Sequence, residues 1–153
     1  MKLKTLFAVL LISTMTINTS CDKDTFATMK ADIAGVTWEA SLASVIGANY
    51  SDYMTIVGFD LTGKKIFISI KATGPGTYNL LALEGSTETY AVYLLDKDDE
   101  SDGTKKYLST SGTVTITEFG DGKISGTFSF TAANSLDDSL LISNGVFDNV
   151  PYL

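Results

Sequence analysis

The 153-residue chain contains no histidine and no arginine, and it has a single cysteine, a single tryptophan and two prolines. The absence of histidine excludes Ser-His-Asp and Cys-His catalysis, and it excludes metal sites built on imidazole. A lone cysteine cannot form a disulfide within the chain, so a disulfide framework is excluded as well. Any catalysis would have to rest on Asp, Glu, Lys, Tyr or Ser. We expect a protein that is not an enzyme and needs no cofactor.

The charge is strongly one-sided. All eleven basic residues are lysines, and they stand against 18 Asp plus Glu, which gives a net charge of −7. Nucleic-acid phosphates require clustered Lys or Arg, so we expect no nucleic-acid partner. The same acidic surplus disfavours electrostatic attraction to an anionic lipid surface.

The sole cysteine, Cys21, follows a short apolar segment close to the start of the chain. Lys2 and Lys4 precede an apolar run at 6–12, which is far shorter than the roughly 20 residues that span a bilayer. A positive start, a short apolar run and small residues before a cleavage point are the layout of a secretory signal peptide. We therefore predict that residues 1–20 are removed, which leaves 133 residues with nine lysines and a net charge of −9.

Cys21 lies at the predicted cleavage point, where the sequence resembles the lipobox of bacterial lipoproteins. In a lipobox the cysteine is acylated and becomes the mature N-terminus. Thr19 and Ser20 fit that pattern, whereas Asn18 stands where an aliphatic residue is usual. Each buried CH₂ contributes roughly 0.8 kcal/mol, so the two or more acyl chains of such an anchor hold stably. We expect the membrane to be a partner of the protein through Cys21.

The predicted anchor also suggests where the protein is displayed. Residues 21–24 would form the lipidated N-terminus and a short acidic tether, and residues 25–153 would form a single domain close to the membrane. The tether sequence Asp-Lys-Asp resembles the surface-export signal of Bacteroidota lipoproteins. We predict a lipid-anchored outer-membrane protein exposed at the cell surface, with a periplasm-facing position as the alternative.

The domain shows the period-2 alternation of β-strands and no long helical period. Ile66, Ile68 and Ile70 share one face of a strand, and a later strand at 123–132 sets apolar residues against serine and threonine. One apolar and one hydroxyl face is typical of an antiparallel sheet with a solvated side. The pattern predicts an all-β fold of about nine strands, either a β-sandwich or an open β-barrel. The expected strands are 28–33, 36–43, 53–60, 65–71, 77–81, 89–95, 113–119, 123–132 and 139–150.

Short glycine-containing links separate most of these runs, as hairpins require. Inside the last run, Asn144-Gly145 is either a turn or a bulge within one strand.

Aromatic residues are the first candidates for ligand contact. Trp38 is the only tryptophan, and its position in a strand favours the core over an exposed stacking platform. Alternation places Tyr90 and Tyr93 on opposite faces of their strand, so one of the two is expected to be exposed or to line a groove. Trp38, Tyr90 and Tyr93 are therefore the candidate ligand contacts, with packing as the competing interpretation.

The densest acidic stretch lies at 96–103 and is a weak calcium candidate. Asp98, Glu100 and Asp102 are spaced like the opening of an EF-hand loop. The position that needs a bidentate glutamate is Ser109, and no helices are expected to flank the loop. A solvated acidic loop without a metal is the favoured interpretation.

A glycosidase-like pair of carboxylates is the enzymatic alternative, because such a pair needs only two carboxyl groups about 5–9.5 Å apart. Nothing in the sequence spacing selects a pair. The acidic residues in or near expected strands are Glu39, Asp60, Glu84, Glu88 and Glu118.

Several stretches carry a resemblance to a known family. They are MKADIAGVTWEA at 29–40, SGTVTIT at 111–117, ISGTFSF at 124–130 and SNGVF at 143–147. In this order, behind a lipobox, they resemble a family of small, uncharacterised lipoproteins from Bacteroidota. The resemblance covers nearly all of the mature chain and is weakest at 81–106. It implies a β fold and a lipid anchor, and it carries no catalytic residues.

Together these features predict an envelope-anchored lipoprotein that acts as a non-enzymatic binding or scaffold module. The ligand classes left open are a glycan, a small apolar molecule and another envelope protein. The alternatives are the carboxylate-dependent hydrolase and a structural subunit of an outer-membrane complex.

Overall fold

The computed structural model describes residues 26–50, 52–81 and 89–153, so Cys21 and the predicted signal and tether lie outside the described residues. The described part is all β, with ten strands and no helix. Their bounds are β1 Thr28–Ile33, β2 Val36–Glu39, β3 Ile46–Tyr50, β4 Tyr53–Phe59, β5 Lys65–Ile70, β6 Gly76–Asn79, β7 Tyr90–Leu94, β8 Lys106–Gly120, β9 Lys123–Ala133 and β10 Ser139–Pro151.

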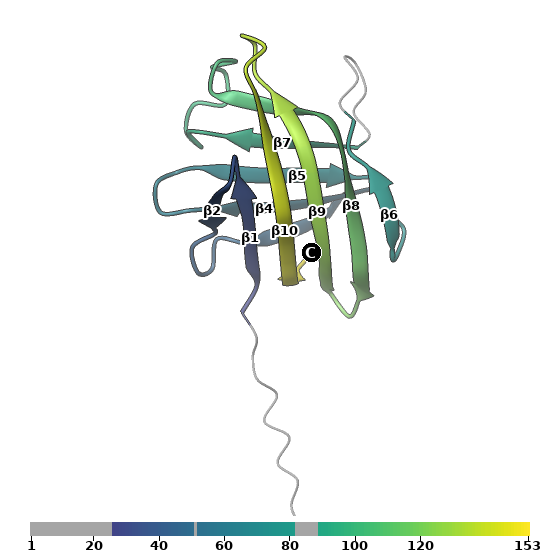
Figure 1. Cartoon of the computed structure of the whole chain (residues 1–153). Helices are drawn as coiled ribbons and strands as arrows, with labels where there is room; N and C mark the ends of the chain where they lie inside the picture. The colour runs from purple at the N-terminus through teal and green to yellow at the C-terminus, as the bar shows by residue number, and fades with distance from the viewer. Residues whose placement is uncertain (1–25, 51, 82–88) are drawn as a thin grey trace, which may run out of the picture.

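All ten strands belong to one antiparallel sheet, in the order β2-β1-β10-β9-β8-β7-β5-β4-β3, with β6 paired to β8. Figure 1 shows β8, β9 and β10 in front and β4, β5 and β7 crossing behind them, so that the sheet curls over itself as a half-barrel. The predicted all-β antiparallel fold is confirmed. Because the sheet is single and continuous, the architecture is the open barrel and not the two-sheet sandwich.

One edge of the sheet, strand β3, meets the last residues of the chain, which follow β10. Gly47 of edge strand β3 forms an isolated parallel bridge with Tyr152, and the Asn49 amide donates to the Leu153 carbonyl at 3.0 Å. A Cβ on Gly47 would lie 3.0 Å from the carbonyl oxygen of Pro151, so glycine allows this close approach.

Apolar residues from nearly every strand fill the inside of the curl. Ile66, Ile68 and Ile70 of β5 are fully buried there, as their alternation predicted. Other large buried members of the core are Met29, Met54, Ile56, Leu80, Ile116, Ile124, Phe130, Ile142 and Phe147. The interior is therefore a packed core.

The strands of the second half carry bulges that bend the sheet. In β10 the register against β9 shifts between Ile142 and Gly145, and Asn144 has a φ of 52°. Asn144-Gly145 is thus a bulge inside one strand and not a turn. The Asn144 side chain donates to the Asp32 carboxylate at 2.8 Å, which ties the bulge to β1.

Two expectations about individual strands were wrong. Strand β3 was not predicted, because Gly47, Ala48 and Asn49 leave only Ile46 and Tyr50 as large apolar or aromatic residues among its five positions. Ser125 was assigned to the solvated face of β9, but it is buried. Its hydroxyl donates to the Asp148 carboxylate at 3.0 Å and accepts the Asn149 amide at 3.1 Å.

Candidate functional site

A row of apolar side chains crosses the outer face of the sheet, on the side away from the packed core. Val57 of β4 pairs with Phe67 of β5, Phe67 pairs with Val92 of β7, and Val92 pairs with Leu108 of β8. Directly paired residues on one face of a sheet touch through their side chains. The row therefore makes a continuous apolar strip on a surface where alternation usually places polar residues.

Two aromatic rings lie together on this strip. Tyr90 pairs with Ser69, two residues along from the pairing of Phe67 with Val92, so the two rings are diagonal neighbours on the same face. Their centroids are 5.7 Å apart and their planes meet at 34°. Both residues are only partly buried, so the rings present apolar area to solvent.

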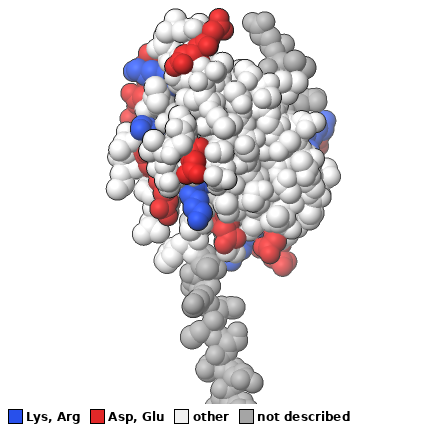
Figure 2. All heavy atoms as spheres, viewed as in Figure 1, with Lys and Arg blue, Asp and Glu red and all other residues white. Residues whose placement is uncertain are grey.

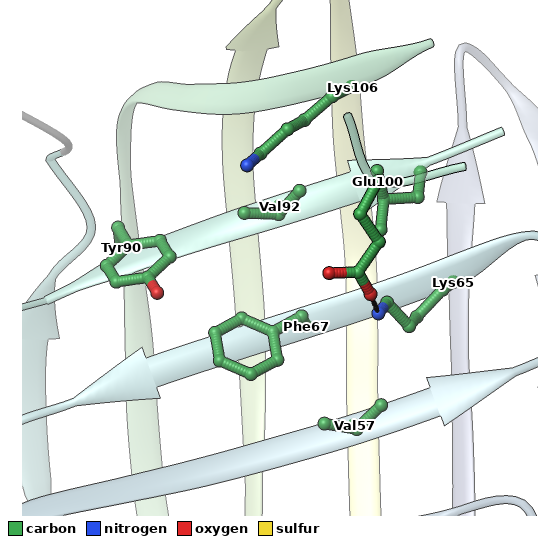
Figure 3. Close-up of a pocket in the computed structure, with 8 residues that line it drawn as sticks. Val57, Lys65, Phe67, Tyr90, Val92, Glu100 and Lys106 are labelled. Atoms are coloured by element: carbon green, nitrogen blue, oxygen red, sulfur yellow. Dashed lines mark hydrogen bonds and ion pairs between the residues drawn. The ribbon is translucent and has the colours of Figure 1, made fainter. Parts of the chain in front are cut away.

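The strip forms the floor of a groove of about 270 Å³ with a charged rim (Figure 3). Its lining residues are Val57, Lys65, Phe67, Tyr90, Val92, Leu94, Glu100 and Lys106. An apolar floor with a few converging polar groups is the usual composition of a small-ligand site. We call this feature the outer groove.

The rim of the outer groove is built by two lysines and one glutamate. Lys65 of β5 forms an ion pair with Glu100, which comes from the segment between β7 and β8. Lys106, the first residue of β8, extends its side chain over Val92 toward Tyr90 (Figure 3). The outer groove thus contains one residue from the aromatic candidates, Tyr90, and one from the calcium candidates, Glu100.

The acidic stretch at 96–103 is tied to lysines. Glu100 pairs with Lys65, and the Lys97 ammonium donates to Asp98 at 2.6 Å. The Lys105 ammonium lies 3.2 Å from Asp99, 3.8 Å from Asp102 and 3.9 Å from Asp96. Within residues 26–50, 52–81 and 89–153, no group of three acidic side chains is arranged to hold a metal ion. The calcium candidates Asp98, Glu100 and Asp102 therefore point to three different lysines.

Hydrogen bonds and ion pairs in and beside this acidic stretch shift the pKa values of Lys105 and Asp102. The hydrogen bond to Asp99 and the charge of that carboxylate raise the pKa of Lys105. Hydrogen bonds from the Thr104 hydroxyl and amide, at 2.7 and 2.9 Å, lower the pKa of Asp102.

Trp38 and Tyr93 lie on the other face of the sheet, where both are buried. They line a second depression of about 310 Å³, together with Glu39, Asp60 and Lys64. The Trp38 indole N–H is buried and has no acceptor among the described residues. Burial, followed by the nearby Asp60 carboxylate, raises the pKa of Tyr93 to about 12. The structure thus joins Trp38 with Tyr93 and separates both from Tyr90.

The candidate carboxylates do not form a pair in the outer groove, where Glu100 is the only carboxylate among the described lining residues. Asp60 shares the second depression with Glu39, and one oxygen of Asp60 accepts three hydrogen bonds from the β4–β5 turn. Glu118 lies 3.4 Å from the Ser125 hydroxyl, which also contacts Asp148. Glu84 and Glu88 lie outside the described residues.

Sequence reasoning missed most of the outer groove. Phe67 appeared only as part of a strand at 65–71, and neither Lys65 nor Lys106 was singled out. The available signal was the apolar residue at 67, midway between polar Lys65 and Ser69 on the face opposite the three isoleucines. An apolar side chain at that position marks a strand that is apolar on both faces.

A family model described as a domain of unknown function, DUF6252, matches residues 25–151. The chain belongs to the DUF6252 family. No match was found among curated proteins or among solved structures. The DUF6252 domain covers every strand of the half-barrel and begins just after the predicted tether. In the part of the chain that the structure describes, no helix has the length and hydropathy to span a bilayer.

Proposed function

We propose that this DUF6252 protein is a membrane-anchored, non-enzymatic binding module whose outer groove holds a sugar ring of a glycan. The observation that carries the proposal is the pair of partly exposed rings, Phe67 and Tyr90, on an aliphatic floor with a charged rim. A sugar ring has a C–H face that stacks on aromatic rings and a rim of hydroxyls that needs hydrogen-bonding partners. The outer groove offers both kinds of surface within one small depression.

The other ligand classes fit the molecule less well. A small apolar ligand would favour an internal cavity, but the inside of the curl is filled by the core. A stable protein partner needs about 800 Å² on each side, and its buried centre is usually poor in charge. The outer groove holds only about 270 Å³, and three of its eight lining residues are charged.

The composition of the outer groove favours binding over hydrolysis. Two-carboxylate glycosidases need an acid and a second carboxylate on opposite sides of the scissile bond. Glu100 is the one carboxylate among the described residues of the groove, where it forms an ion pair with Lys65. A single carboxylate can accept hydrogen bonds from sugar hydroxyls, but it leaves the two-carboxylate mechanism without its second group.

We further propose that the protein is a lipoprotein of a Bacteroidota outer membrane, held through Cys21 and displayed at the cell surface. The support is the lysine-bearing, short apolar segment before Cys21 and the acidic residues after it. The match to the family model begins at residue 25, so the proposed anchor lies outside the conserved domain model. Surface display would bring the outer groove into contact with extracellular polysaccharide.

The full-length protein, purified from membranes in detergent, tests the glycan proposal on a glycan array, with hits measured by calorimetry. We expect binding to at least one glycan class and a loss of up to about tenfold in affinity for Tyr90→Ala, taking the value of about 0.5–1.5 kcal/mol for contacts between aromatic rings as the scale. The matched control is Tyr50→Ala, because Tyr50 is 78% exposed on edge strand β3 and does not line the groove. Equal loss in both variants, or no glycan bound at all, would contradict the proposal.

A further inference from the structure

We infer that the outer groove prefers an acidic sugar, one that carries a carboxylate, and that Lys106 recognises this group. The inference rests on the proposed glycan-binding function. It adds a charge requirement that neither the family description nor the aromatic floor implies.

The charge of the outer groove is opposite to that of the whole chain. Its described lining contains two lysines and one glutamate, a net charge of +1, in a chain with a net charge of −7. Four other depressions of the described surface are neutral or negative. Their lining charges are −2 around Leu42 and Leu61, −1 around Trp38, −1 around Phe119 and 0 around Gly145. A positively charged groove on an acidic protein indicates a site that binds an anion.

Lys65 and Lys106 differ in whether a carboxylate neutralises their charge. The Lys65 ammonium is paired with Glu100, and the Lys65 side chain is only 16% exposed, so this pair is a neutral unit. Lys106 has no described carboxylate within the 4.0 Å distance of an ion pair. The net positive charge of the groove therefore belongs to Lys106.

The position of Lys106 suits the edge of a stacked sugar ring. Lys106 pairs with Leu94 of β7, and Leu94 pairs with Lys65 of β5, so the two lysines flank one strand. The Lys106 side chain lies across Val92 with its ammonium directed toward Tyr90 (Figure 3). A ring stacked on Phe67 and Tyr90 would place a carboxylate at its edge close to this ammonium.

The physical gain comes from a charge-assisted hydrogen bond in a partly apolar setting. Such bonds are roughly twice as strong as bonds between neutral groups. Lys106 is half-buried against aliphatic side chains, where charge interactions are screened less than on an open surface. A neutral sugar would gain the same stacking energy and would leave the Lys106 charge without a counter-charge.

The test compares two probes that differ only in charge. The first is a tetrasaccharide with glucuronic acid in alternate positions, and the second is its carboxyl-reduced form, in which each carboxylate is a primary alcohol. Affinities of the full-length protein in detergent are measured by calorimetry at low and high salt. We expect at least tenfold tighter binding of the acidic probe, with a preference that shrinks as salt is raised.

Lys106→Gln separates recognition by this residue from general attraction. We expect this variant to bind both probes within about twofold of each other. Lys123→Gln is the matched control, since Lys123 lines a different depression at the β8–β9 turn, and it should keep the full preference. The circular dichroism spectrum of each variant checks its folding. If Lys106→Gln does not fold, the salt dependence of the wild-type preference decides instead.

The outcomes distinguish the two levels of the proposal. Equal binding of both probes by the wild-type protein would overturn the acidic preference and leave glycan binding in place. A preference that survives Lys106→Gln would overturn the role of Lys106. Binding of neither probe, together with no hit on the array, would overturn the glycan-binding function and this inference with it.

Discussion

The ring of Phe67 on β5 lies 5.7 Å from the ring of Tyr90 on β7, although the core of the same strands is on the opposite face. Aromatic residues on the outer face of a strand expose apolar area where polar side chains would keep the surface soluble. In the half-barrel this occurs where the outer groove lies, between the charged side chains of Lys65 and Lys106. The register of β5 against β7 therefore places Phe67 and Tyr90 side by side, and this pair of rings is the basis of the proposed function.

The contact between these rings should be measurable without a ligand. We expect Phe67→Ala and Tyr90→Ala each to lower the free energy of unfolding, with a coupling of about 0.5–1.5 kcal/mol between them. Urea unfolding of the two single variants and the double variant gives this value as a double-mutant cycle. Additive losses within about 0.3 kcal/mol would show that the rings do not interact in solution.

Much of the fold could be predicted from the sequence, because half-buried strands show a period of two. Strand β1 was predicted with its observed bounds, and β9 to within one residue. Strand β8 was predicted from 113 onward and begins at Lys106, because its first part passes through a bulge between Ser109 and Ser111. Bulges break the alternation on which the prediction depends.

The outer groove was harder to predict because it is made across strands. Alternation separates Tyr90 from Tyr93, and the structure places them on opposite faces, with Tyr93 in the core. The contact of Glu100 with Lys65 joins residues 35 positions apart. Sequence spacing carries no information about such a contact until the sheet order is known.

Gly126 allows close packing within the sheet, and replacing it should be costly. A Cβ at Gly126 would lie 2.3 Å from the Thr115 carbonyl oxygen and 2.6 Å from the Phe147 ring. We expect Gly126→Ala to lower the free energy of unfolding by about 2–3 kcal/mol, in the range of overpacked cores. Gly120→Ala is the control, because an added Cβ there meets no atom of the described residues within 4 Å, its chain neighbours aside. Urea titrations that give equal stability for both variants would refute this account of Gly126.

The buried Tyr93 should make stability depend on alkaline pH. Its pKa is raised to about 12, whereas an unfolded tyrosine titrates near 10. The folded state therefore holds the proton more tightly, so stability is full below about pH 10 and falls as the pH rises toward 12. At 1.36 kcal/mol per pKa unit, the loss is up to about 3 kcal/mol.

Tyr93→Phe removes the titrating group and tests this assignment. We expect its unfolding free energy to fall less than that of the wild type between pH 10 and 12. Asp60→Asn should move the Tyr93 titration to lower pH, since the Asp60 carboxylate contributes to the shift. Absorbance at the tyrosinate band follows the titration. Identical pH profiles for wild type and Tyr93→Phe would assign the alkaline loss to other residues.

The anchor proposed at Cys21 gives the last prediction. Cys21→Ser removes the only thiol in the chain, so acylation and cleavage at that position should both fail. We expect the wild-type protein in membranes to have a mature N-terminus at Cys21, with the added mass of two or more acyl chains. Those chains hold it stably in the membrane, because one chain alone binds only marginally. Mass spectrometry of the membrane fraction measures both features. A wild-type protein with an unmodified Cys21, recovered in the soluble fraction, would remove the anchor and with it the surface location of the outer groove.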